Sequence, residues 1–294
     1  MSAPIRSADP RAPLTVRDHD RRRGGRRYVY PVLSRRARGV SVGINLNPDA
    51  TCNWRCIYCQ VPGLSRGAGP PIDLAALEHE LGELLDEMGT PEWWERHVPD
   101  AARRFPSDVA FSGDGEPTTS PQFPAAVDVT LAALRARSLE RDVKLLLITN
   151  GSLVHQPRVQ EGLRRLTQGR AEVWFKLDGA SDDTLRRLND AHTTLAHQRA
   201  NLALAARLAP TWVQTMVLDF HGPSLDAAGR DAYCKLLRGL LDEGVPLRGV
   251  LLYGLARPSQ QPEAPHLRPL PAAWLEEFAA EIRAATGLAV SIHS

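Results

Sequence analysis

The hydrophobic pattern divides the chain into two parts. Residues 1–38 are rich in Pro and Arg and show no hydrophobic periodicity, so we expect a partly disordered leader that becomes ordered near Tyr28. Over residues 39–294, short apolar runs alternate with segments whose apolar residues recur every three or four positions. Such runs predict strands and such segments predict helices, so we expect one folded domain over residues 39–294.

Strands and helices are predicted to alternate along this domain. The predicted strands are 40–46, 108–111, 143–148, 172–177, 211–217 and 248–253, with an edge strand at 289–292. The predicted helices are 73–88, 121–137, 157–166, 182–188, 195–208, 225–241 and 272–285, with a short insertion at 92–95. Alternation of apolar strands with helices predicts an α/β fold with right-handed βαβ units around a parallel sheet. Ligands of such folds bind beyond the carboxyl ends of the strands, so candidate site residues follow each strand.

Composition agrees with a globular enzyme. The chain has 294 residues, of which 43% are hydrophobic and 24% are charged, as in ordinary soluble domains. It has no apolar run near the ~18–20 residues that span a bilayer, and residues 1–6 lack the apolar core of a secretory signal. Four cysteines, three of them close together, argue against a disulfide framework. We therefore expect a cytoplasmic protein without membrane contact.

The net charge of +2 is distributed unevenly. Residues 1–40 contain eleven Arg and three Asp, a charge of about +8, and the remainder is acidic. This pattern predicts either a basic arm that contacts phosphate groups, for example of RNA, or a solvated leader without a partner. The charge pattern alone leaves both open.

The strongest chemical signal is a cysteine motif directly after the first predicted strand. Cys52, Cys56 and Cys59 have the spacing C-x3-C-x2-C. A [4Fe–4S] cluster normally takes four thiolates, so three leave one iron open to bind a reactant. Zinc, with His79 or His97 as a further ligand, and unrelated structural cysteines are the alternatives.

The motif resembles the signature of the radical S-adenosylmethionine (SAM) superfamily in ligand number, order and spacing, and Tyr58 supplies the aromatic residue expected before the third cysteine. The resemblance implies a partial (β/α)6 barrel over residues 39–294, preceded by an N-terminal Arg-rich extension. It also implies a [4Fe–4S] cluster whose open iron chelates SAM, and an electron donor such as a flavodoxin or ferredoxin. One electron would then cleave SAM to methionine and a 5′-deoxyadenosyl radical.

The second predicted strand ends in Gly113, Asp114, Gly115 and Glu116. Glycines let backbone groups approach a ligand, and Glu116 can accept from an ammonium group. The turn resembles the "GGE" element that holds the SAM amino group in the family, with Asp114 interrupting the glycine pair. The longer string, Gly-Asp-Gly-Glu-Pro-Thr, also resembles the branch that includes the tRNA wybutosine-synthesis enzymes. A simple turn is the alternative interpretation.

Polar residues also follow the later strands. Thr149 and Asn150 end the third strand, and Gln214 lies in the fifth. Lys176 and Asp178 are two residues apart and so face the same side of the fourth strand, either as an internal ion pair or as catalytic and cofactor-binding groups. The resemblance implies that these residues contact SAM or the substrate, and it places adenine near residues 253–257.

Three further residues are weaker candidates. Asn189, beyond the helix that follows the fourth strand, is a possible site residue, and His221 could transfer a proton. Cys234 lies in a predicted helix and is expected to be a buried apolar residue.

The sequence therefore predicts a radical SAM enzyme that abstracts hydrogen from an unidentified substrate. RNA, in particular tRNA, and a peptide or small metabolite are the alternative substrates. A non-catalytic metal-cluster regulator that holds DNA through the leader is the alternative from another class.

Overall fold

The computed structural model describes residues 12–16, 21, 23–34 and 39–294. Its main sheet has eight strands in the order β1-β2-β5-β6-β7-β8-β10-β12. All neighbouring strands are parallel except β1, which is antiparallel to β2. The strands are β1 (Val29–Leu33), β2 (Val40–Ile44), β5 (Pro106–Phe111), β6 (Lys144–Thr149), β7 (Arg170–Lys176), β8 (Thr211–Val217), β10 (Leu247–Gly254) and β12 (Val290–His293).

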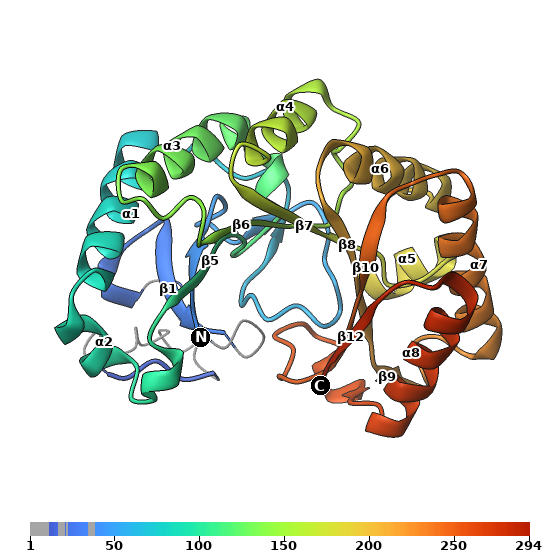
Figure 1. Cartoon of the computed structure of the whole chain (residues 1–294). Helices are drawn as coiled ribbons and strands as arrows, with labels where there is room; N and C mark the ends of the chain where they lie inside the picture. The colour runs from blue at the N-terminus through green and yellow to red at the C-terminus, as the bar shows by residue number, and fades with distance from the viewer. Residues whose placement is uncertain (1–11, 17–20, 22, 35–38) are drawn as a thin grey trace.

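The sheet is curved, and the helices cover its outer face (Figure 1). The helices are α1 (Leu74–Met88), α2 (Pro91–His97), α3 (Phe123–Arg135), α4 (Pro157–Leu166), α5 (Asp182–Asn189), α6 (Leu195–Leu208), α7 (Ala227–Asp242) and α8 (Ala272–Thr286). β1 and β12 lie at opposite ends of the sheet and do not pair with each other. The predicted α/β fold with a partial barrel is therefore confirmed, and the barrel stays open between β1 and β12.

The six predicted strands and the edge strand at 289–292 are all present. Two predicted helices, 157–166 and 195–208, have the predicted bounds. The insertion at 92–95 is part of α2, whose first turn carries Pro91 and is capped by Thr90. Two short strand pairs form separate sheets, β3 (Thr51–Cys52) with β4 (Ser65–Arg66) and β9 (Asp219–Phe220) with β11 (Leu267–Arg268). No described helix is long and apolar enough to cross a membrane.

The expected boundary between leader and domain at residue 39 differs from the structure. β1 belongs to the main sheet and all five of its residues are buried. The carboxylate of Glu80 on α1 accepts from the backbone N–H groups of Arg27, Tyr28 and Val29 (3.0, 2.7 and 3.1 Å). The folded domain therefore begins before residue 39, because this strand pairs with β2 and is fixed to α1.

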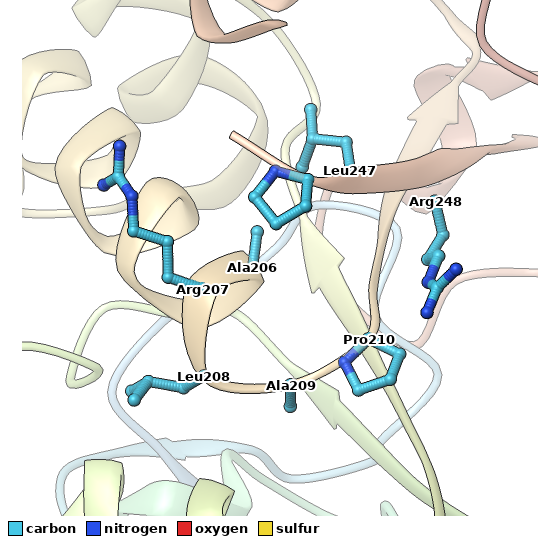
Figure 2. Close-up of a pocket in the computed structure, with 8 residues that line it drawn as sticks. Ala206, Arg207, Leu208, Ala209, Pro210, Leu247 and Arg248 are labelled. Carbon is cyan, nitrogen blue, oxygen red and sulfur yellow. The ribbon is translucent and has the colours of Figure 1, made fainter. Parts of the chain in front are cut away.

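A pocket away from the cysteine motif lies at the amino ends of β8 and β10. It is lined by Ala206–Pro210 and Pro246–Arg248. Figure 2 shows the side chains of Arg207 and Arg248 on opposite sides of it, pointing in different directions. None of the residues predicted from the sequence lines this pocket, and it lies at the opposite end of the strands from the residues described next.

Candidate active site

The carboxyl ends of the strands enclose a cavity of about 340 Å³ that gathers most of the predicted residues. The predicted residues that line it are Cys52, Cys56, Tyr58, Cys59, Gly113, Asp114, Gly115, Glu116, Asn150, Lys176 and Gln214. Tyr253 to Arg257, after β10, line it as well. Thr149 and Asp178 are not among its lining residues. Residues from six strands therefore converge on one site, as the parallel topology requires.

The loop that carries the cysteines is fixed by contacts from two other loops. Asn53 donates to the hydroxyl of Ser152 (2.8 Å) and accepts from the amide of Asn150 (2.8 Å), both after β6. The backbone N–H groups of Arg55 and Ile57 donate to carbonyl groups at the end of α5 (3.1 and 2.9 Å). The positions of the thiols are thus set by contacts distant in sequence.

Asn189, the last residue of α5, is central to this arrangement. Its amide nitrogen lies 3.3 Å from the sulfur of Cys56, 2.6 Å from the carboxylate of Asp178 and 3.2 Å from the hydroxyl of Tyr58. The side chain is fully buried. Asn189 therefore links the second cysteine to the end of β7.

Burial affects the protonation of two of the three thiols. Burial raises the pKa of Cys52 to about 12 and that of Cys56 to about 11, so metal binding has to displace their protons. Within the described ranges, no three His, Cys, Asp or Glu side chains converge as ligands of one metal ion. A single zinc needs all ligands about 2.0–2.3 Å from one point, whereas a cubane spreads three thiolates over separate iron atoms.

The two histidines considered as zinc ligands lie elsewhere. His79 pairs with Glu83 on the exposed face of α1 (3.3 Å). His97 is buried at the end of α2, and neither residue lines the cavity. The zinc alternative therefore lacks a fourth protein ligand among these candidates.

The Gly-Asp-Gly-Glu turn after β5 is held in place by its own side chains. The carboxylate of Glu116 accepts from Thr118 N–H (3.1 Å), the hydroxyls of Thr118 and Thr149 (both 2.6 Å) and Asn150 N–H (2.6 Å). Burial raises the pKa of Glu116, although these donors favour its charged form. Thr149 thus acts on the site through Glu116.

Close packing explains the second glycine of the turn. A Cβ atom at Gly115 would lie 2.0 Å from the carbonyl oxygen of Thr51, in the cysteine loop. Only glycine allows the two loops to approach so closely. Gly115 therefore lets the backbone of the turn lie directly against the cysteine motif.

Lys176 and Asp178 act on Tyr58 from different sides. The ammonium group of Lys176 lies 5.2 Å from the centroid of the Tyr58 ring, within reach of a cation–π interaction. Burial lowers the pKa of Lys176, but the nearby thiols and Asp178 outweigh it and raise that pKa. The hydroxyl group of Tyr58 donates a hydrogen bond to the carboxylate of Asp178. An ion pair between Lys176 and Asp178, the alternative interpretation of these two residues, is not among the described contacts.

Asp178 is placed differently from the prediction. Its side chain is buried and accepts from Met216 N–H (2.8 Å), Asn189 and Tyr58. These partners occupy both oxygens, and Asp178 is not among the residues that line the cavity. We interpret Asp178 as a positioning residue.

Gln214 carries an unused acceptor at the cavity. The residue is 9% exposed, and its Oε1 has no hydrogen-bond partner among the described residues. A buried polar atom without a partner costs free energy, so this oxygen suits a ligand that donates to it. The hydroxyl or amino groups of SAM are donors of this kind.

The two other sequence candidates lie outside the cavity. His221 is exposed and stacks on His266, with ring centroids 5.2 Å apart. Cys234 is buried in the main core, as expected. Sequence reasoning missed Asn45, Asn53 and Trp54, although the last two lie inside the cysteine motif.

Comparisons with known proteins show the family to which the chain belongs. The model of the radical SAM superfamily matches residues 46–224. A Helicobacter pylori protein described as a UPF0026 protein is 32% identical over 167 residues, which are 55% of this chain and 46% of that protein. The chain thus spans about half the length of this relative.

Solved structures share the fold. A radical SAM methyltransferase from Sphaerobacter thermophilus superposes with a TM-score of 0.57 at 13% identity, over 90% of this chain and 69% of that chain. TYW1 with a lysine–pyruvate adduct bound gives a TM-score of 0.49 at 13% identity, over 85% and 74%, which is too low to argue from. The family match covers more than half of the sequence and includes the cysteine motif, and the chain therefore belongs to the radical SAM superfamily of enzymes.

Proposed function

We propose that Cys52, Cys56 and Cys59 hold a [4Fe–4S] cluster and that SAM binds in the adjoining cavity. The observation that carries this proposal is the convergence of three thiols, the Gly113–Glu116 turn and Lys176 on one cavity. When bound, the reduced cluster supplies the electron that cleaves SAM to a 5′-deoxyadenosyl radical, which abstracts hydrogen from a substrate.

The protein residues orient and shield the reactants. Asn189 donates to the sulfur of Cys56, and such hydrogen bonds stabilise a thiolate and tune the potential of a cluster. A Cβ atom at Gly113 would lie 2.5 Å from the Asn45 side chain, and one at Gly115 would lie 2.0 Å from the Thr51 carbonyl, so the two glycines let the turn pack beside the cysteine loop. Lys176 can meet the SAM carboxylate, and Gln214 can accept from a ribose hydroxyl or an amino group.

Aromatic side chains beside the cysteines exclude water from the cavity. Trp54 and Tyr58 line the cavity and are 3% and 5% exposed. A radical that abstracts hydrogen needs a dry, enclosed site. We therefore assign these aromatic side chains the task of closing the cavity beside the cysteines.

The substrate class has two candidates. The Gly-Asp-Gly-Glu-Pro-Thr string and the Arg-rich leader favour RNA, as in the wybutosine branch. The enclosed cavity favours a peptide side chain or a small metabolite. An electron donor such as a flavodoxin or ferredoxin, and a cytoplasmic location that protects an oxygen-labile cluster, belong to the same proposal.

The test is anoxic SAM cleavage. The protein is reconstituted with iron and sulfide, reduced with dithionite and given SAM, and 5′-deoxyadenosine is quantified beside the variants Cys56→Ala and Cys234→Ala. We expect product from the wild type and from Cys234→Ala, whose thiol lies in the core, and none from Cys56→Ala. A stable cluster that binds no SAM would instead favour the non-catalytic regulator.

A further inference from the structure

The described part of the leader crosses the open side of the barrel. Leu14 N–H donates to the carbonyl of His97 (2.7 Å), and the carbonyl of Val16 accepts from Arg257 (2.9 Å). His97 ends α2, which packs on α1 near β1, whereas Arg257 follows β10, beside β12. Figure 1 shows α2 and β10 on opposite arms of the curved sheet. Residues 14–16 therefore bridge the two ends that the sheet itself leaves apart.

Arg21 extends from this leader into the cavity. It is one of the lining residues, and its Nη1 lies 2.5 Å from a carboxylate oxygen of Asp114. The other oxygen of Asp114 accepts from the amide of Asn45 (2.6 Å). The Nε of Arg21 is buried and has no hydrogen-bond partner among the described residues. The guanidinium group is thus held in one orientation and keeps a donor unused.

The cavity beside Arg21 has two unlike walls. β1, β2 and β5 with the residue after it contribute hydroxyl groups, two small apolar side chains and the carboxylate of Asp108, which accepts from Ser41. β6 and β7 contribute mainly apolar side chains. The hydroxyl residues are Tyr30, Ser41 and Ser112, the apolar residues on the same side are Val32 and Ala110, and those of β6 and β7 are Leu146, Ile148 and Trp174. None of them belongs to the set assigned to SAM. This region therefore suits a small molecule with a polar face and a hydrocarbon face.

Two other described arginines of the leader are engaged by the fold, whereas the exposed Arg27 lies over the ring of Tyr28, 5.5 Å from its centroid. Arg23 is 4% exposed and donates to the carbonyl of Ala12. Arg26 pairs with Glu87 on α1 (2.6 Å). Both guanidinium groups serve internal contacts, so Arg23 and Arg26 do not reach outward for RNA phosphates.

We propose that Arg21 is a specificity-determining residue that receives the carboxylate or phosphate of a small organic anion, the substrate of this enzyme. The assignment rests on the proposed function, because the walls described here adjoin the SAM site. A planar guanidinium fixed by the Asp114 carboxylate and beside Tyr30 presents its unpaired Nε–H group to a second anion with defined geometry. The leader across the open side and a cavity of about 340 Å³ restrict the site to small molecules.

Binding of two anion probes tests this assignment. Inorganic phosphate and butyrate are titrated by calorimetry into the anoxic, cluster-loaded protein saturated with SAM. We expect about tenfold weaker binding of at least one probe in Arg21→Met and a smaller loss in Arg21→Lys. The matched control, Arg26→Met, removes an equal charge from the leader outside the cavity and should bind as the wild type does. If Arg21→Met does not fold, Arg21→Lys carries the comparison.

Three outcomes overturn the assignment. In the first, the wild-type protein binds neither probe. In the second, Arg21→Met and Arg26→Met lose anion affinity equally. In the third, Arg21→Met binds SAM about tenfold more weakly and its anion binding is unchanged. Single-stranded RNA that binds the wild type and is lost equally in both variants would assign the leader to RNA. Formation of 5′-deoxyadenosine in the same preparations separates this result from failure of the proposed function.

Discussion

Replacing Asp178 with Asn tests whether this carboxylate positions the cysteine loop or contacts the cofactor. Asp178 is 1% exposed and accepts from Met216 N–H, Asn189 and Tyr58. An amide of the same shape has a single acceptor oxygen. In either orientation its NH2 group therefore faces a donor that the carboxylate satisfied.

The magnitude follows from these contacts. The variant loses at least one hydrogen bond to a charged group, about 1.5–3 kcal/mol, and leaves a donor unpaired, about 1–3 kcal/mol. Because the Tyr58 hydroxyl can turn to accept, we take the low end of both ranges, about 2.5 kcal/mol in total. At roughly 2–4 °C per kcal/mol for a large domain, the melting temperature should fall by about 5–10 °C.

The assay compares the cluster-free proteins by thermal unfolding, then measures iron per chain and SAM affinity after reconstitution. We expect a lower melting temperature and less iron in Asp178→Asn, with SAM affinity of the loaded fraction within about threefold of the wild type. The control is Asp183→Asn on α5, the helix that follows Asp178; its side chain is 80% exposed, and the stability of this variant should change by less than about 0.5 kcal/mol. An unchanged melting temperature together with about tenfold weaker SAM binding would refute the positioning role.

Four other changes test the rest of the site. Lys176→Met should weaken SAM binding about tenfold and leave iron content unchanged, as measured by calorimetry and iron assay. A loss of iron with unchanged SAM affinity would contradict the role of Lys176 in SAM binding. Glu116→Gln should lower the free energy of unfolding in urea by about 2–4 kcal/mol, because its NH2 would face one of four donors. Gly115→Ala should abolish SAM binding, because its Cβ would meet the Thr51 carbonyl at 2.0 Å; wild-type affinity would contradict this. Burial lowers the pKa of His97, so the unfolded chain is protonated first and stability should fall as pH drops below about 6.5; His97→Gln should flatten that slope in melts from pH 7 to 5.

The elements that depend on local pattern could be predicted from the sequence. The strand at 211–217 and the helix at 195–208 have the predicted bounds because their apolar periods are regular. β1 was missed, since Pro31 interrupts it and Arg residues flank it. Proline is tolerated there because β1 lies at the end of the sheet and pairs only with β2. That pairing is a long-range contact which no local pattern indicates.

The site residues also differ in whether local sequence or contacts distant in sequence determine their positions. The cysteines could be predicted because ligand spacing is a local property of the chain. The orientation of Asp178 could not, because β7 ends at Lys176 and the alternation of a strand no longer applies two residues later. Arg21 could be recognised only as part of a basic leader, since its partner Asp114 is 93 residues away.

These distant contacts also explain how a cysteine loop can be ready for a cluster. Asn53, Arg55 and Ile57 are bound to the ends of β6 and α5 by groups of the protein itself. A loop that is already ordered has less conformational entropy to lose when a cofactor binds. The buried thiols oppose this gain, because their raised pKa values require proton release on metal binding. Iron retention should therefore depend on the contacts that hold the loop as much as on the three sulfur atoms, and variants such as Asn189→Leu should lose iron although every ligand is present.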